Sequence, residues 1–238
     1  MNLVLLEPAE RDAPLPRADV RARHIVDILR RGIGDRFDAG VVNGPIGVAT
    51  VTSLDDRALT FAFTPAREPA PLPDVTLLVG LPRPNTARDI LRDATTLGAR
   101  ALHFVATERT TASYATARLW TDGEVRTQLL LGAAQAFDTR IPVVTSTHTL
   151  ADALENYGAG ARIALDNYEA DAHLGRWLAA PATAGPVTLC IGPERGWGPR
   201  DRAALRAAGA TLHHLGTRVL RVEMAVVAAL ALVHARGN

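Results

Sequence analysis

Hydrophobic and polar positions follow different patterns in the first and in the later part of the chain. In the first 63 residues, short runs alternate apolar with polar side chains, as strands with one buried face do. Turn-forming pairs separate these runs, so the pattern predicts a small antiparallel barrel. The runs and the pairs between them are 36–42, Asn43-Gly44, 46–52, Asp55-Asp56 and 58–63.

A helix and a linker complete this first region. Residues 20–31 place Ile25, Ile28 and Leu29 on one helical face, and Gly32 is expected to end the helix. Four prolines within residues 64–74 remove backbone donors and disfavour helix, which predicts an extended linker. The predicted domains are therefore 1–68 and 74–238.

After the linker, apolar runs of strand length alternate with stretches of helical periodicity. Continuous apolar strands joined by helices are typical of a mostly parallel sheet covered on both faces. Ligands of such sheets bind beyond the carboxyl ends of the strands. The expected strands are 75–81, 101–106, 142–146, 162–166, 187–191 and 211–215, and the expected helices are 86–97, 124–137, 150–157, 199–208 and 222–235.

Composition is that of an ordinary globular protein, with 47% hydrophobic and 21% charged residues and a net charge of +1. The longest apolar stretch, 222–233, contains Glu223 and is too short to span a bilayer, and the first residues lack a basic region of a signal peptide. We therefore expect a cytoplasmic protein. The single Cys190 lies in an apolar strand, and the histidines lack metal-ligand spacing, so no disulfide and no metal are expected.

The first candidate for chemistry is Gly192-Pro-Glu-Arg-Gly-Trp-Gly-Pro199, which follows a predicted strand. Its glycines allow positive φ and a close approach of a ligand to the backbone, and Pro199 suits the first turn of a helix. The motif equally fits a tight strand-to-helix turn without a ligand. Its spacing is not the dinucleotide fingerprint, which disfavours a Rossmann-type nucleotide enzyme.

The second candidate is Leu215-Gly-Thr-Arg-Val-Leu-Arg-Val-Glu223, which follows the last predicted strand. It places Arg218 and Arg221 at the mouth of the sheet, where they either contact a ligand or are solvated. Glu223 opens a helix and also complements its dipole. That helix is apolar nearly all round, which predicts burial in the domain or at a subunit interface.

Other polar side chains are candidates for contacts with RNA, although each also fits an ordinary solvated surface. Thr107-Glu-Arg-Thr110 follows a strand, and Gln135 and Arg140 lie around the end of a helix. All positive charge on side chains other than histidine comes from arginine, which pairs with phosphate bidentately and stacks on bases. The expected RNA-binding residues are Arg17, Arg21, Arg23, Arg30, Arg109, Gln135 and Arg140, with Arg31 in the same basic patch.

Together these segments resemble the RsmE family of 16S rRNA uridine-N3 methyltransferases, in the SPOUT superfamily. The resemblance follows the chain from His24-Ile-Val-Asp-Ile-Leu-Arg30 through 107–110 to the two loops at 192–197 and 215–223. It implies a PUA-like β-barrel that binds RNA, then a SPOUT α/β domain with a trefoil knot and helices on both faces. It also implies S-adenosyl-L-methionine as cofactor, the small ribosomal subunit as partner and a homodimer through helices of the knot region.

If the resemblance holds, the chemistry of methyl transfer to uridine N3 leads to a hypothesis for the roles of the loop residues. Arg221 and Arg218 would stabilise negative charge on the uracil, and Glu194 or Glu223 would act as the base. The family's pattern differs at Arg195, Asp138, Thr96, Val222 and Met224, which leaves the acceptor nucleotide open. The alternatives are a SPOUT methyltransferase for another RNA or small molecule, and a non-catalytic RNA-binding protein of ribosome assembly. The expected cofactor-binding residues are Leu165, Ile191, Gly192, Pro193, Glu194, Gly196, Trp197, Leu215, Gly216, Val219 and Leu220.

Overall fold

The computed structural model describes residues 2–170, 172–180 and 185–236, and the chain divides into two compact units. Unit 1 comprises residues 1–71 and 133–141, and unit 2 comprises 72–132 and 142–238. The return segment 133–141 was not part of the first predicted domain. It belongs there because Thr139 Oγ1 donates to the Gly44 carbonyl at 2.6 Å, and Asn43 N–H donates to the Thr139 carbonyl at 2.8 Å.

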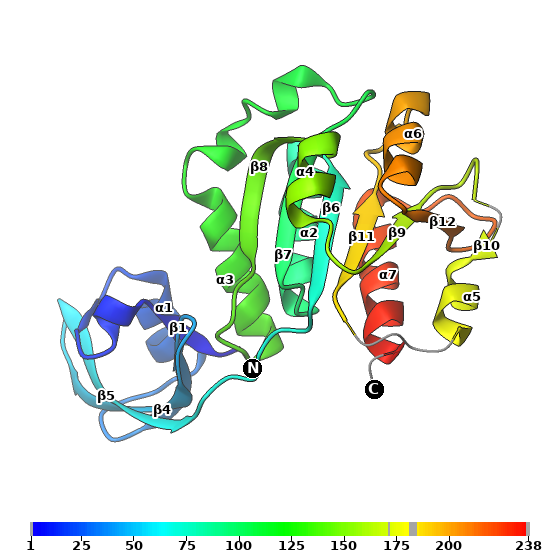
Figure 1. Ribbon diagram of the computed structural model, residues 1–238. Helices are drawn as coiled ribbons and strands as arrows, with labels where there is room; N and C mark the ends of the chain where they lie inside the picture. The colour runs from blue at the N-terminus through cyan, green and yellow to red at the C-terminus, as the bar shows by residue number, and fades with distance from the viewer. Residues whose placement is uncertain (1, 171, 181–184, 237–238) are drawn as a thin grey trace. The chain divides into compact units, whose positions relative to one another are not determined.

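Unit 1 is a curled sheet with strand order β1-β3-β4-β5-β2 (Figure 1). The pair β1–β3 is parallel, and the other neighbours are antiparallel. Apolar side chains of alternate positions, with Phe37 against Phe61 at 5.9 Å between ring centres, form its core. The strands are β1 (Val4–Leu6), β2 (Leu15–Pro16), β3 (Arg36–Val41), β4 (Ile46–Leu54) and β5 (Ala58–Arg67), with a 3₁₀ turn at Pro8–Glu10.

Two details of unit 1 differ from the sequence prediction. The helix is α1 (Val20–Arg23) continued by a π-helical segment (His24–Ile28), and it ends before Gly32 because Arg30 already has a positive φ of 53°. The linker prediction began too early, since β5 continues to Arg67 and pairs with β4 there. Pro65 lacks a backbone N–H and so weakens strand pairing, but it lies near the end of β5, and pairing with β4 still extends the strand past it.

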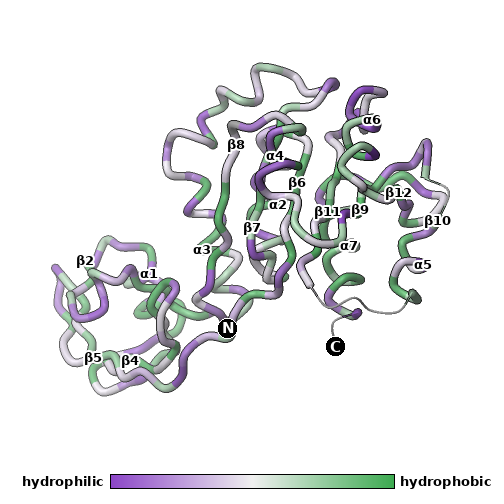
Figure 2. Tube along the Cα trace, in the orientation of Figure 1, coloured by the Kyte–Doolittle hydropathy of each residue, from purple (hydrophilic) through white to green (hydrophobic). Residues whose placement is uncertain are grey.

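Unit 2 contains a seven-stranded sheet in the order β10-β12-β9-β11-β6-β7-β8. Every neighbouring pair is parallel, which confirms the predicted sheet type. Strands in the middle of this sheet are mostly apolar, with Thr76, His103 and Thr188 among their residues, and their apolar residues appear green in Figure 2. The strands are β6 (Val75–Gly80), β7 (Ala101–Ala106), β8 (Val143–Thr149), β9 (Ala161–Leu165), β10 (Ala172–His173), β11 (Val187–Ile191) and β12 (Thr211–His214).

Helices cover both faces of this sheet, with α4 in front of it and α7 behind it in Figure 1. Helix α2 packs against α7, whereas α4 packs against α6 over a core that includes Leu78, Cys190 and Trp197. No helix within the described ranges is long and apolar enough to cross a membrane. The helices are α2 (Pro84–Thr96), α3 (Glu124–Ala136), α4 (Leu150–Tyr157), α5 (Leu174–Ala179), α6 (Pro199–Ala207) and α7 (Val222–Arg236), with 3₁₀ turns at Ala112–Tyr114 and Arg118–Trp120.

The order of the last strands brings three loops together. The chain leaves β9, forms β10 and α5, and returns as β11 between β9 and β6. After α6 it places β12 on the other side of β9, and it then passes back to begin α7 against α2. The loops that follow β9, β11 and β12 therefore meet at the carboxyl end of the sheet, the edge where such folds bind ligands.

Candidate functional site

A cavity of about 610 Å³ lies at this carboxyl edge. Its walls come from the residues after β6, β9, β11 and β12 and from the first turn of α7. Apolar side chains, Leu165, Ile191, Leu215 and Leu220 among them, line it together with several charged groups. The volume lies in the range of sites for small molecules and cofactors.

The first wall is residues 192–198, here called the glycine loop, which joins β11 to α6. Gly196 has a φ of +64° and donates its N–H to the Pro193 carbonyl at 2.7 Å, which closes a tight turn. The indole of Trp197 is buried and donates to the Leu165 carbonyl at 2.9 Å. The loop is therefore fastened to the end of the neighbouring strand β9.

Neighbouring strands and loops further fix the glycine loop. A Cβ on Gly80 would lie 2.4 Å from Pro193 Cδ and 2.7 Å from its backbone nitrogen, so only glycine lets the loop pass over the end of β6. Arg109 Nη1 donates to the Arg195 carbonyl at 2.7 Å. The Glu194 carboxylate accepts a hydrogen bond from Arg83 N–H at 2.9 Å. The segment predicted at 107–110 thus supports the loop and does not itself line this cavity.

The end of the glycine loop is held by the buried carboxylate of Asp201, and the more exposed carboxylate of Glu108 lies beside it. Gly198 N–H donates to Asp201 Oδ2 at 2.8 Å, and Glu108 N–H donates to the same carboxylate at 3.1 and 3.2 Å. Glu108 Oε2 in turn accepts from Arg200 N–H at 3.0 Å. This arrangement places carboxylates at the amino end of α6, where the helix dipole favours negative charge.

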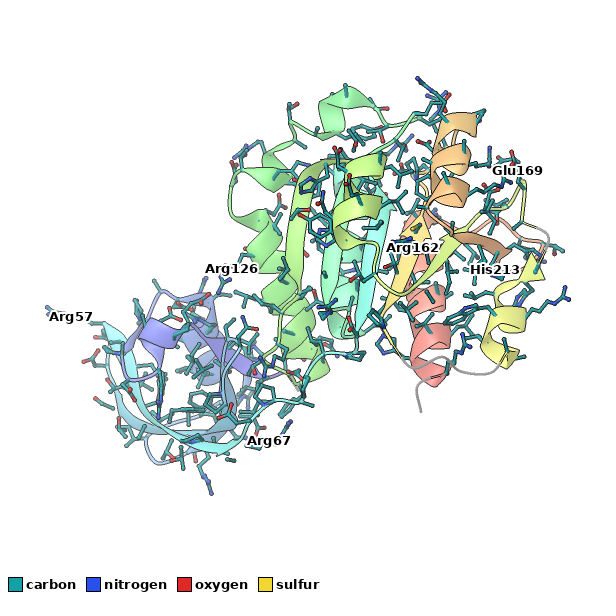
Figure 3. All side chains as sticks on the ribbon, in the orientation of Figure 1. Arg57, Arg67, Arg126, Arg162, Glu169 and His213 are labelled. Atoms are coloured by element: carbon teal, nitrogen blue, oxygen red, sulfur yellow. The ribbon has the colours of Figure 1, made fainter. Side chains whose placement is uncertain are left out.

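Behind the second wall, residues 166–169 after β9, lies a buried ion pair. Arg202 Nε and Asp166 Oδ2 are 2.5 Å apart, and their side chains are 6% and 1% exposed. Burial opposes ionisation of Asp166, but hydrogen bonds from Arg202 and from the N–H groups of Tyr168 and Glu169 outweigh it and lower its pKa. Figure 3 labels Glu169, whose carboxylate also pairs with Arg206 of α6 at 2.6 Å.

The third wall is residues 215–221, here called the arginine loop. Gly216 has a φ of +129° and donates its N–H to His214 Nδ1 at 3.1 Å, and the Arg221 carbonyl accepts from Ala225. Arg218 and Arg221 are exposed, and both line the cavity. The loop thus presents two guanidinium groups on a backbone that makes few hydrogen bonds to other described residues.

The structure brings nearly all of the predicted cofactor and catalytic residues into one cavity. Gly216 does not line it but directly follows Leu215, which does. The predicted residues that line the cavity are Leu165, Ile191, Gly192, Pro193, Glu194, Gly196, Trp197, Leu215, Arg218, Val219, Leu220, Arg221 and Glu223.

Other lining residues were missed by the sequence prediction. Arg83 and Thr86 follow β6, where Pro82 and Pro84 were the available signal of a strand end at the same sheet edge. The polar residues that directly follow β9 were a second signal, because they too stand at the end of a strand at this edge of the sheet. The missed residues are Arg83, Thr86, Asp166, Asn167, Tyr168, Val222 and Ala225.

The predicted RNA-binding residues lie mostly in unit 1 and differ in how free their side chains are. Arg23, Arg30 and Gln135 are exposed, whereas Arg140 is half-buried. Arg17 pairs with Asp27 at 2.8 Å. Arg21 binds Glu10 at 2.6 Å, Asp19 at 2.8 Å and the Leu5 carbonyl at 3.0 Å, which ties its guanidinium to the fold of unit 1.

Comparison with known proteins decides the family. The sequence profile of an RNA methyltransferase domain matches residues 68–234. A relative from Treponema pallidum, Ribosomal RNA small subunit methyltransferase E, is 33% identical over an alignment that covers 100% of this chain and 92% of that protein. The chain belongs to the RsmE family. A further member, Ribosomal RNA small subunit methyltransferase E 1 from Borreliella burgdorferi, is 24% identical across 96% of this chain and 95% of its own length.

A solved structure shows the same fold. Ribosomal RNA small subunit methyltransferase E from Neisseria gonorrhoeae, crystallised with S-adenosyl methionine bound, superposes with a TM-score of 0.78 at 22% identity. The match covers 99% of this chain and 97% of that chain. It confirms the predicted fold class for this RsmE member, a SPOUT-type α/β domain preceded by a small barrel.

Among the five family departures noted in the sequence, Val222 lines the cavity, whereas the other four do not. Thr96 Oγ1 donates to the carbonyls of Arg92 and Gly132, at 3.0 and 3.1 Å, and so joins α2 to α3. Asp138 Oδ1 accepts from the N–H groups of Thr139 and Arg140. The carbonyl of Arg195 accepts from Arg109, while its side chain is exposed. In this RsmE member, Thr96 and Asp138 therefore have local structural roles.

Proposed function

We propose that this chain transfers a methyl group from S-adenosyl-L-methionine to N3 of a uridine in 16S rRNA of the small ribosomal subunit. The supporting observation is the cavity at the carboxyl edge of the sheet, in a chain of the RsmE family. It combines apolar walls, a glycine loop that exposes backbone and two arginines on the third wall. Action on a ribosomal subunit would place the protein in the cytoplasm.

The cavity fits the chemistry of this cofactor. A purine ring needs apolar surface on its faces, which Leu165, Ile191 and Leu220 offer. A sulfonium and an amino acid group need polar partners, which the backbone of 192–196 and the carboxylates at the rim provide. When bound, S-adenosylmethionine supplies an already activated methyl group. The residues of the chain then have to align the nucleophile with it, which alone contributes several kcal/mol.

Residues of the arginine loop and of α7 suit the acceptor. Negative charge develops on the uracil oxygens as N3 loses its proton, and the guanidinium of Arg221, with Arg218, stabilises that charge. Glu223 is the better candidate for the base that accepts this proton, because Glu194 Oε1 already accepts from Arg83 N–H. The site then binds, orients and deprotonates the uridine with side chains from the arginine loop and the first turn of α7.

Exposed apolar side chains support a homodimer as part of the proposal. Val219 of the arginine loop is 79% exposed and Met224 of α7 is 55% exposed, and both belong to or adjoin the cavity wall. A protein contact would remove the apolar surface of these two side chains from water. A second copy that covers this region would also order the arginine loop.

The deciding experiment is transfer of a labelled methyl group from S-adenosylmethionine to small ribosomal subunits that lack their native uridine-N3 methylation. Naked 16S rRNA runs in parallel, and mass spectrometry identifies the modified nucleoside. We expect N3-methyluridine at a single site. Transfer to another atom or nucleotide would show that the acceptor is not N3 of a uridine at the proposed site. Binding of the cofactor without any transfer would favour the non-catalytic RNA-binding alternative.

A further inference from the structure

One aromatic side chain at the cavity lies outside the buried core of unit 2. Tyr168 lies in the loop after β9, lines the cavity and is 76% exposed. Of the large apolar or aromatic side chains that are exposed in the described ranges, it is the single aromatic one. Exposing so much aromatic surface loses the stabilisation that burial would give, which suggests that a ligand covers it.

The loop around Tyr168 is held in place by contacts within unit 2. Its N–H donates to Asp166 Oδ1 at 2.6 Å, and Asp166 is itself fixed by the buried Arg202. The Arg202 guanidinium carbon lies 5.5 Å from the centre of the tyrosine ring, within reach of a cation–π contact. A Cβ on Gly196 would lie 3.6 Å from the ring, so the ring borders the glycine loop. These contacts fix the position of the Tyr168 ring at the cavity.

We propose that Tyr168 is a stacking platform for an unpaired nucleobase of the RNA substrate. Proteins that read single-stranded RNA commonly stack its bases on aromatic side chains. The inference rests on the proposed function and adds a residue that governs how the substrate is held.

The exposure of Tyr168 favours a base of the RNA over the cofactor's adenine. Side chains deeper in the cavity, Ile191 and Leu165 among them, are buried or half-buried and already offer apolar faces for a purine. Tyr168 lines the cavity but is 76% exposed, so its ring is open to a substrate that arrives from solvent. Arg218 and Arg221 of the arginine loop line the same cavity, so a base on Tyr168 would have groups that suit phosphate near it.

The test measures methyl transfer to unmethylated small subunits by Tyr168→Ala, Tyr168→Leu and Tyr168→Phe, with cofactor affinity measured separately by calorimetry. Alanine and leucine should each raise KM for the subunit about tenfold, the effect of losing one stacked base, whereas phenylalanine should keep the wild-type value. The Kd for S-adenosylmethionine and kcat at saturating subunit should change less than about twofold, because stacking at the rim acts on RNA binding.

Val143→Ala is the matched control, since Val143 is 65% exposed on β8 and does not line the cavity. The stacking role is overturned if Tyr168→Ala leaves KM unchanged. It is also overturned if leucine serves as well as phenylalanine, or if the loss appears in cofactor affinity instead. A wild-type protein that transfers no methyl group would refute the proposed function itself, a result distinct from these.

Discussion

The glycine loop and the arginine loop face the same cavity, yet the chain holds them very differently. The glycine loop is fastened by Trp197 to β9, by Arg109 to the loop after β7 and by close contact of Pro193 with Gly80. Of the hydrogen bonds between described residues, the arginine loop takes part in the contact of Gly216 with His214 and that of Arg221 with Ala225. One wall is rigid and the other is lightly held.

This difference matches what each wall has to recognise. A cofactor has the same shape in every turnover, so a wall that is fixed beforehand binds it without a cost for ordering. A ribosomal substrate arrives as a large particle, and a lightly held loop with two arginines adjusts to it. The contrast predicts that changes behind the glycine loop act on stability and cofactor affinity, whereas changes in the arginine loop act on turnover.

The largest expected effect comes from breaking the ion pair that ties α6 to the loop after β9. Asp166→Ala would leave the buried guanidinium of Arg202 with the longer pair to Glu169, at 3.5 Å, and loss of a buried partner typically costs about 3–5 kcal/mol of folding free energy. Chemical denaturation measures the loss. Asp89→Ala is the control, because its pair with Arg92 is exposed and should contribute less than about 1 kcal/mol.

The pH dependence of stability provides an independent check of the same pair. The folded state lowers the pKa of Asp166 below its ordinary value of 3.8, so its stabilising contribution is complete above that value. The contribution is lost as the pH falls through the lower, folded pKa. Denaturation of the wild type and Asp166→Asn between pH 7 and pH 2 should therefore show converging stabilities in acid. A difference that stays constant would contradict the pair's role.

Arg221→Ala tests the lightly held wall. If its guanidinium stabilises charge on the uracil, kcat should fall about 100-fold, while Kd for S-adenosylmethionine and the midpoint of unfolding stay near the wild-type values. Arg221→Lys should recover part of the loss. Arg57→Ala, at the exposed turn between β4 and β5 that Figure 3 labels, is the control for loss of positive charge. If Arg221→Ala lowers cofactor affinity and leaves kcat unchanged, the arginine loop also serves cofactor binding, and the proposed division of roles between the two loops is wrong.

Much of this arrangement could be predicted from the sequence, because it depends on local patterns. Helix α4 and strand β11 begin and end at the predicted residues, since each combines a clear hydrophobic period with end signals. The sequence predicted that both loops lie at the same edge of the sheet, because the carboxyl ends of parallel strands share one edge. Short elements such as β10 and α5 were missed, as two and six residues carry too little period to detect.

The missed features depend on residues far apart in the chain. Asp166 and Arg202 are separated by 36 positions, and no spacing rule brings them together before the strand order is known. The return segment 133–141 packs in unit 1 through Thr139 and Gly44, which are 95 positions apart. Tyr168 drew no attention for the same reason, since its significance comes from Arg202 and Gly196 around it.

Gly80→Ala tests whether steric contact holds the glycine loop. The new methyl group would overlap Cδ and the backbone nitrogen of Pro193, and relief of such overpacking typically costs about 1–3 kcal/mol. Displacement of the loop should also weaken binding of S-adenosylmethionine by calorimetry. Gly32→Ala is the control, because the nearest atom to its added Cβ is 3.9 Å away. Unchanged cofactor affinity in Gly80→Ala would show that the contact between Pro193 and Gly80, at the end of β6, does not shape the cofactor site.

The smallest expected effect is that of Arg109→Ala. It removes one hydrogen bond to the Arg195 carbonyl, and a single bond of this kind near the surface is worth about 1 kcal/mol. Because the other fastenings remain, the Kd for S-adenosylmethionine should rise only about threefold, with kcat unchanged. Arg200→Ala is the matched control, since its side chain is 85% exposed and lies 3.6 Å from Glu108. A loss in Arg109→Ala that appears in KM for the ribosomal subunit, with cofactor binding intact, would instead make Arg109 the RNA contact that its sequence position first suggested.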